Sequence, residues 1–167
     1  MNLGKLFTSS NSRLIDVGIL VIRLMLGAVM FAHGSQKVLG VFGGKGLETT
    51  VGMMSGSYGS LLPYLSAFTE FLGGAAMILG ILTRFWGIGI LINMSVAVMT
   101  VHLKNGFIGQ GGFEFPLTLA MIALAITIMG PGRFSLDALL FKAHKKVELT
   151  SKAGNRRTMP PLVRKAV

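Results

Sequence analysis

The stretch VIRLMLGAVMFAHGSQK (residues 21–37) is the most informative part of the sequence about the fold. It is mostly apolar, yet it carries Arg23 near its start and ends on His33 and Lys37. A run of about 20 apolar residues spans the hydrocarbon core of a bilayer as a helix. A charge inside such a run is costly, so it normally faces the interior of a helix bundle and has a partner there. The stretch therefore predicts one membrane helix of a larger bundle.

The composition of the whole chain supports a membrane protein. Of its 167 residues, 51% are hydrophobic and 13% are charged, and the mean hydropathy is +0.67, which is too apolar for a soluble domain of this size. There is no cysteine, so any redox role would use a borrowed cofactor. The net charge is +10, but nine of the sixteen Lys and Arg lie at or beyond Arg133, so the excess is a tail and not a nucleic-acid-binding face.

We predict an all-α fold, a bundle of four antiparallel transmembrane helices. The helices are expected at about residues 14–33, 61–82, 85–103 and 114–130. The short link of Thr83 and Arg84 makes the second and third helices a hairpin, and the Gly- and Ser-rich loop after the first helix is expected to hold a short helix near residues 47–54.

The chain is expected to divide into a membrane domain and a tail. Residues 1–141 form the domain, in which Pro131 stops the fourth helix and Ser135 offers an N-cap for a surface helix at about residues 135–145. Residues 142–167 form a basic tail with the composition of a disordered segment.

Basic residues predict the orientation of the bundle. If the two termini and the turn at Arg84 share one side, that side also holds Lys5, Arg13 and the nine basic residues from Arg133 onward. The other side then holds only Lys37, Lys45 and Lys104. The positive-inside rule therefore predicts a multi-pass protein with both its N- and C-termini in the cytoplasm.

Two charges are predicted to meet inside the bundle. Arg23 lies nine residues before Ala32, and Glu70 lies nine residues after Leu61, so both are expected roughly 13 to 14 Å below the outer surface at about 1.5 Å per residue. We therefore predict an ion pair between Arg23 and Glu70. Two interpretations of the pair stay open, a functional one and one in which it only fixes the register of the helices.

Helical spacing predicts one inward stripe on each helix. Small residues near the two charges would let the backbones approach closely, and methionine at these spacings is typical of a gap-filling core residue. The predicted stripes consist of Gly27 and Met30; Ala67, Gly73, Gly74 and Met77; Ser95, Met99 and His102; and Glu114, Thr118 and Met121.

Ionisable residues gather at the outer ends of the helices. His33 and Lys37 end the first helix, His102 and Lys104 end the third, and Glu114 opens the fourth. Such a cluster could exchange protons near neutral pH, with His33, His102 and Glu114 as the relay, and it could bind the carbonyls of a quinone or a small anion. The alternative is that each side chain simply reaches the lipid headgroups. No close ligand spacing indicates a metal, and we predict none.

Four segments together resemble the DoxX family of small four-helix bacterial membrane proteins, over about residues 15–140. They are RLMLGAVMFAHGSQKVLG, EFLGGAAMILGILTRFWG, MTVHLKNGF and GPGRFSLD. The resemblance implies a location in the bacterial inner (plasma) membrane. It also implies a relation to membrane subunits of thiosulfate:quinone oxidoreductase and of oxidative-stress complexes. The motif residues that it marks in this chain are Arg23, His33, Gly34, Lys37, Glu70, His102 and Arg133.

The leading functional hypothesis is the membrane subunit of a quinone-linked oxidoreductase. In it, a quinone or its substrate is bound by Arg23, Glu70, His33, Lys37 and His102, and the redox chemistry belongs to the quinone. The alternatives are a non-catalytic scaffold that recruits a partner and a small-solute transporter, and whether the chain is an enzyme stays open. The expected partners are the lipid bilayer, a soluble or membrane redox protein and a second copy of the chain, without nucleic acid.

Overall fold

The computed structural model describes residues 12–59 and 61–140, and it is a bundle of helices. Three spans are long and apolar enough to cross a membrane, and a fourth apolar helix is shorter, which confirms the predicted fold class. In chain order the elements are α2 (Ser12–Val38), α3 (Leu47–Tyr58), α4 (Leu61–Leu79), α5 (Thr83–Ala97), the π-helix η1 (Val98–His102), the 3-10 helix η2 (Leu103–Asn105) and α6 (Glu114–Met129).

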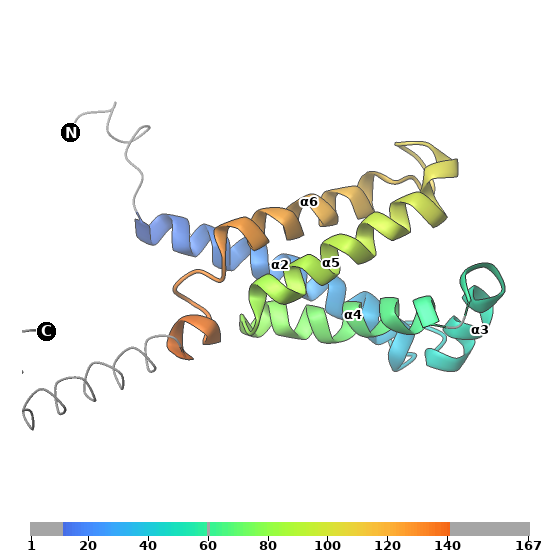
Figure 1. The fold of residues 1–167 in the computed structure, drawn as a ribbon, viewed down its shortest axis with the longest axis horizontal. Helices are drawn as coiled ribbons and strands as arrows, with labels where there is room; N and C mark the ends of the chain where they lie inside the picture. The colour runs from blue at the N-terminus through green and yellow to red at the C-terminus, as the bar shows by residue number, and fades with distance from the viewer. Residues whose placement is uncertain (1–11, 60, 141–167) are drawn as a thin grey trace, which may run out of the picture.

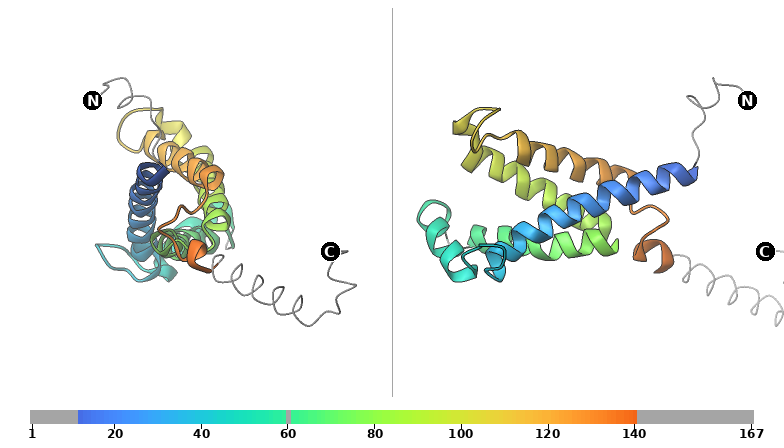
Figure 2. Two further views of the ribbon diagram at one scale, coloured as in Figure 1. Left: turned by 90° about the vertical axis from the view of Figure 1, so that its left-hand side faces the viewer. Right: turned by 180° about the vertical axis from the view of Figure 1, so that it is seen from behind.

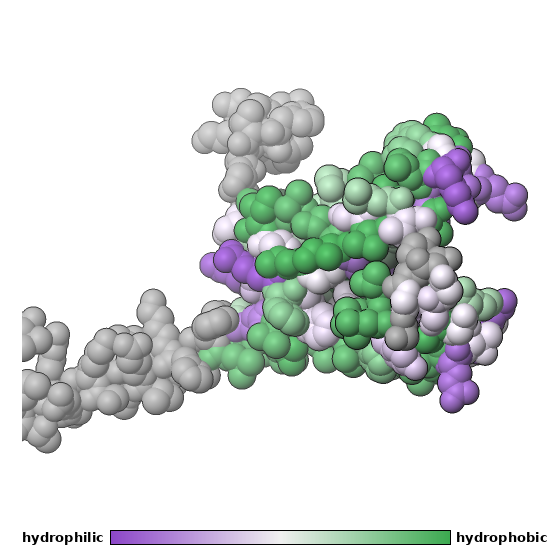
Figure 3. Space-filling view, turned by 45° about the vertical axis from the view of Figure 1, so that its right-hand side comes forward, coloured by the Kyte–Doolittle hydropathy of each residue, from purple (hydrophilic) through white to green (hydrophobic). Residues whose placement is uncertain are grey.

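The long helices form two pairs that diverge toward one end of the molecule (Figure 1). α2 packs along α4, and α5 packs along α6. We call the end with α3 and the α5–α6 loop the α3 end, and the end with the start of α2 and the α4–α5 turn the terminal end; the views from the side and from behind show the same arrangement (Figure 2). Hydrophilic residues gather at both ends, and hydrophobic side chains cover the flank between them (Figure 3).

Glycines let α2 and α4 pack backbone against backbone. A Cβ added at Gly34 would overlap the backbone of Phe71, and one at Gly74 would overlap the backbone of Phe31. At Gly27 an added Cβ would lie 2.9 Å from the carbonyl oxygen of Gly74. The predicted close approach of the backbones at Gly27 and Gly74 is therefore confirmed, and it sets the register of the two helices.

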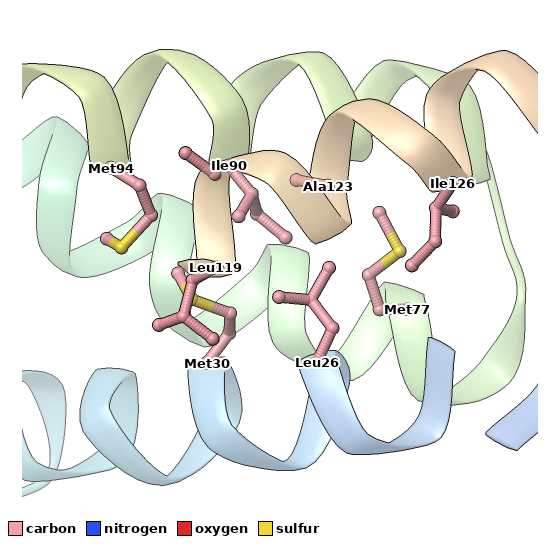
Figure 4. Packing of buried hydrophobic residues seen from close by; sticks show 9 residues of the cluster. Leu26, Met30, Met77, Ile90, Met94, Leu119, Ala123 and Ile126 are labelled. Atoms are coloured by element: carbon pink, nitrogen blue, oxygen red, sulfur yellow. The ribbon is translucent and has the colours of Figure 1, made fainter. Parts of the chain in front are cut away.

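A hydrophobic core fills the space between the two pairs. Leu26 and Met30 of α2 and Met77 of α4 point toward side chains of α5 and α6 (Figure 4). Methionine suits this position because its unbranched chain fills irregular gaps. The buried cluster consists of Leu26, Met30, Met77, Ile90, Met94, Leu119, Ala120, Ala123 and Ile126.

Helix ends differ from the predicted ones where tertiary contacts decide them. α2 continues to Val38 and not to residue 33, because Gly34 packs against α4 and Lys37 reaches a partner there. α4 ends at Leu79, and Gly80 turns the chain with a φ of +68°, so the α4–α5 turn is not formed by Thr83 and Arg84 as predicted. The ends of α6 and the presence of α3 match the prediction closely.

The predicted inward stripes on the last two long helices are wrong at their methionines, whereas His102 of the third helix does face a cavity. Met99 is 72% exposed and Met121 is 49% exposed, while the buried residues of α5 and α6 include Ile90 and Ala123. One cause is the π-helix η1, whose wider turns shift the phase of the residues beyond Ala97. The other is that α6 is apolar on all sides, so hydrophobic periodicity does not mark its buried face.

The segment after α6 folds back over the terminal end. Gly130 and Pro131 end the helix, and residues 136–140 begin a further helical turn. The hydroxyl of Ser135 accepts a hydrogen bond from the backbone N–H of Ala138 at 3.1 Å, which confirms the predicted N-cap. The rest of the expected surface helix and the basic tail lie outside the described residues, so the division into domain and tail stays a prediction.

Candidate functional site

A cavity of about 550 Å³ lies between the diverging helices, toward the α3 end. Apolar side chains make most of its wall, among them Met30, Leu65, Ile92 and Leu119. The polar residues that line it are His33, Lys37, Ser66, Thr69, Glu70, Asn93, Thr100 and His102. An apolar cavity with a few convergent polar groups is the usual form of a small-molecule site, and this volume falls within the roughly 300 to 1,000 Å³ of such sites.

Glu70 is the buried anion of this cavity. Its side chain is 5% exposed, and its Oε1 accepts a hydrogen bond from Lys37 Nζ at 2.6 Å and another from Asn93 Nδ2 at 3.2 Å. The Ser66 hydroxyl lies 3.5 Å from the same oxygen. Its second oxygen, Oε2, is buried and has no hydrogen-bond partner among the described residues. A buried acceptor without a donor is costly, so a turn of the Glu70 carboxylate that brings Oε2 to a donor on a ligand would relieve this cost.

Lys37 is the cation of the pair, and it is more accessible than its partner. Its side chain is 28% exposed and enters the cavity from the last turn of α2. An ammonium group has three N–H donors. Glu70 takes one of them, and the Ser66 hydroxyl lies at the limit of hydrogen bonding, 3.5 Å from Nζ. Lys37 can therefore donate to a ligand without leaving Glu70.

Two histidines line the cavity nearer the α3 end. His102 Nδ1 lies 2.8 Å from the carbonyl oxygen of Gly111, and because a carbonyl only accepts, Nδ1 carries the proton. In a neutral ring this leaves Nε2 of His102 as an acceptor. His33 is exposed to the cavity and lies beside Phe115, with ring centroids 6.1 Å apart. Both imidazoles carry ring nitrogens that can hydrogen-bond a ligand in the cavity.

The predicted ion pair between Arg23 and Glu70 is wrong. Glu70 is paired with Lys37, and Arg23 lies near the terminal end, where its guanidinium meets Gly80 and donates to the carbonyl oxygen of Phe134. The prediction failed because it placed Ala32 level with Leu61, whereas α2 runs on to Val38 and its Gly34 lies against Glu70 and Phe71. Arg23 therefore does not line the cavity.

Residues 130–137, GPGRFSLD, form a clamp over the terminal end. The carboxylate of Asp137 accepts hydrogen bonds from the backbone N–H groups of Leu82 at 2.8 Å and Thr83 at 2.9 Å, so it caps the start of α5. Asp137 also attracts the guanidinium of the buried Arg23. Asp16 of α2 holds Arg133 through an ion pair of 3.3 Å and a bond to its backbone N–H. The clamp satisfies the buried Arg23 in part, because Nη2 donates to Phe134 while Nε and Nη1 have no partner among the described residues.

Part of the observed site was predicted from the sequence. His33, Lys37, Glu70 and His102 do line one cavity, whereas Glu114 does not. The predicted outer residue Lys104 is likewise absent from the lining.

Three polar residues that the structure gives a role were missed. Asn93 could have been predicted, because an asparagine inside an apolar run needs a hydrogen-bond partner. The roles of Asp16 and Asp137 could not have been predicted, since their partners are backbone groups and residues distant in the sequence. Among residues 12–59 and 61–140, no group of three or more His, Asp or Glu is placed to hold a metal ion.

Comparison with known proteins identifies relatives of this chain. The DoxX family model matches residues 18–103. "Putative oxidoreductase CatD" of Bacillus subtilis is 33% identical over 132 residues, which cover 78% of this chain and 92% of that protein. "Inner membrane protein YqjF" of Escherichia coli is 31% identical over 134 residues, 78% of this chain and 97% of that protein. "Uncharacterized membrane protein Rv3486" of Mycobacterium tuberculosis is 29% identical over 136 residues, 74% of this chain and 82% of that protein. No solved structure shows significant similarity.

Proposed function

Because the chain belongs to the DoxX family of membrane proteins, we propose that it binds a membrane quinone and serves as the membrane subunit of a quinone-linked oxidoreductase. The observation that carries the proposal is Glu70, a buried carboxylate on the wall of a largely apolar cavity, with Oε2 lacking a donor among the described residues. The names of two relatives, "Putative oxidoreductase CatD" and "Inner membrane protein YqjF", agree with this proposal.

The residues of the cavity fit a quinone ring in both of its redox forms. The carbonyls of the oxidised ring need donors, which Lys37 and Asn93 can supply. The hydroxyls of the reduced ring need acceptors, which Glu70 and Nε2 of His102 can supply. A bound quinone would take up two electrons and two protons from outside the ring. The part of this chain is to orient the ring, to exclude water with apolar walls and to exchange protons through His33 and His102.

Bound quinone is the first test of this function. The protein purified in mild detergent is expected to carry nearly one quinone per chain, measured by solvent extraction and native mass spectrometry. The variant Glu70→Gln is expected to bind quinone about tenfold or more weakly and to lose most of it during purification, because a hydrogen bond to a charged group contributes about 1.5 to 3 kcal/mol.

A matched control uses the same substitution on the surface. Glu48 is exposed in the first turn of α3, and Glu48→Gln is expected to retain the quinone. Wild-type protein without quinone, or equal retention by Glu48→Gln and Glu70→Gln, would contradict the proposal.

The orientation in the inner membrane is part of the same proposal. We place both termini in the cytoplasm. The α3 end, where His33 and His102 line the cavity, then lies on the opposite side of the membrane. Because the chain has no cysteine, single cysteines report topology cleanly. In spheroplasts a membrane-impermeant maleimide is expected to label Ile108→Cys, in the exposed α5–α6 loop, and to label Leu139→Cys only after permeabilisation. The reverse labelling pattern would show that the protein has the opposite orientation.

A further inference from the structure

The cavity continues to the outer surface of the bundle between α4 and α5. Leu65 of α4 and Ile92 of α5 line it, yet they are 53% and 58% exposed. Leu62 and Val96 share both properties. Side chains that line a cavity and are also exposed mark the place where it opens. We call this opening, formed by Leu62, Leu65, Gly89, Ile92 and Val96, the α4–α5 portal.

Gly89 lines the cavity at this opening, and helix packing does not require it to be glycine. A Cβ added there would meet only the methyl group of Thr69, at 3.6 Å, which is an ordinary van der Waals contact. Gly34 and Gly74 differ, because a Cβ on either would overlap the backbone of the neighbouring helix. The missing side chain of Gly89 therefore leaves space in the cavity without bringing two helices together.

The polarity of the cavity changes along its length toward the portal. Glu70 and Lys37 pair inside the bundle, whereas every residue of the portal is apolar. The exposed side chains next to the portal are also apolar, among them Leu61, Phe68 and Ile88, so this face would meet hydrocarbon in a membrane. A ligand that satisfies Glu70 and also fills the portal must have a polar head and an apolar chain.

The volume is too large for the head alone. The cavity of about 550 Å³ lies within the roughly 300 to 1,000 Å³ of sites that hold drug-sized ligands. A substituted quinone ring without a chain is smaller than such a ligand, so volume remains along the apolar wall. This space matches the first segment of a chain attached to the ring.

We propose that the α4–α5 portal is a binding subsite for the apolar chain of a lipid-soluble ligand, which enters from the bilayer and places its ring at Glu70. This proposal rests on the proposed function, since the ring site is the same. It adds the place of the isoprenoid or alkyl chain and its route of entry, so a quinone with such a chain binds more tightly than a quinone without one. Gly89 is the residue that keeps the subsite open.

The test compares two probes on the intact protein in lipid nanodiscs. Duroquinone has no chain, and a decyl-substituted benzoquinone has one. The variant Gly89→Leu is expected to weaken binding of the decyl compound about tenfold or more, because burial of each methylene contributes about 0.8 kcal/mol, and to change the Kd of duroquinone little. Both proteins are measured in the same nanodiscs, so partitioning of the probe into lipid cancels.

Two controls separate the portal from folding. Gly18→Leu makes the same substitution on α2, where an added Cβ meets nothing within 4 Å, and is expected to bind both probes normally. Val96→Trp narrows the portal from its rim and is expected to act like Gly89→Leu, should that variant fold poorly.

Three results would contradict the proposed subsite. Equal affinity of wild type and both portal variants for the decyl compound would overturn the chain subsite and leave the ring site standing. If wild type binds neither probe, the proposed function fails and the subsite fails with it. A phospholipid that stays bound in native mass spectra while no quinone displaces it would also overturn the proposal.

Discussion

Replacing Gly34 with alanine is expected to lower the free energy of unfolding by about 3 kcal/mol or more, at the upper end of overpacking. The added Cβ would overlap the backbone of Phe71, and a backbone inside a helix cannot give way as a flexible side chain can. α2 and α4 would have to separate. Because the same Cβ also meets the backbone of Glu70, the variant is expected to lose bound quinone as well. Unfolding in detergent and quinone extraction measure the two effects.

Gly18 supplies the matched control on the same helix. An added Cβ there meets nothing within 4 Å, so Gly18→Ala is expected to keep or raise stability, by up to about 1 kcal/mol from helix propensity. Similar stability of Gly18→Ala and Gly34→Ala would mean that α2 and α4 do not pack backbone to backbone.

The fold class was predictable because it depends mainly on hydropathy. Runs of apolar residues near α2, α4, α5 and α6 give four helices, and lipid leaves the backbone few other ways to satisfy its hydrogen bonds. Register was not predictable in the same way. The polar letters GSQK after His33 indicated a loop, and only the contact of Gly34 with α4 shows why the helix continues.

The candidate site was likewise predictable in part. His33, Lys37, Glu70 and His102 were identified because ionisable residues are rare in apolar runs, and all four line one cavity. Their partners were misassigned, since a shift in register of a few residues exchanges one cation for another. The clamp at Asp137 depends on backbone donors at Leu82 and Thr83, which no side-chain pattern reveals.

Removing the cation of the cavity is expected to have the other large effect. Lys37→Met leaves the carboxylate of Glu70, which is 5% exposed, without a counter-charge, and breaking a buried pair in this way costs about 3 to 5 kcal/mol. Glu70→Gln is expected to cost less, because the side chain of Lys37 is 28% exposed and can turn toward water. The double variant removes both charges, so its loss of stability is expected to be smaller than the sum of the two single losses.

Arg23 provides the control cycle, because it carries the same charge on the same helix without contacting Glu70. It lies eleven residues before Gly34, the residue of α2 that meets Glu70, or about 16 Å along the axis. The losses of Arg23→Gln and Glu70→Gln are therefore expected to add within about 0.5 kcal/mol, while those of Lys37→Met and Glu70→Gln couple by about 1 kcal/mol or more. Coupling of Glu70 to Arg23 and additivity with Lys37 would reverse the assignment of partners. It would also remove Lys37 from the quinone site, since its ammonium group would then have no anchor in the cavity.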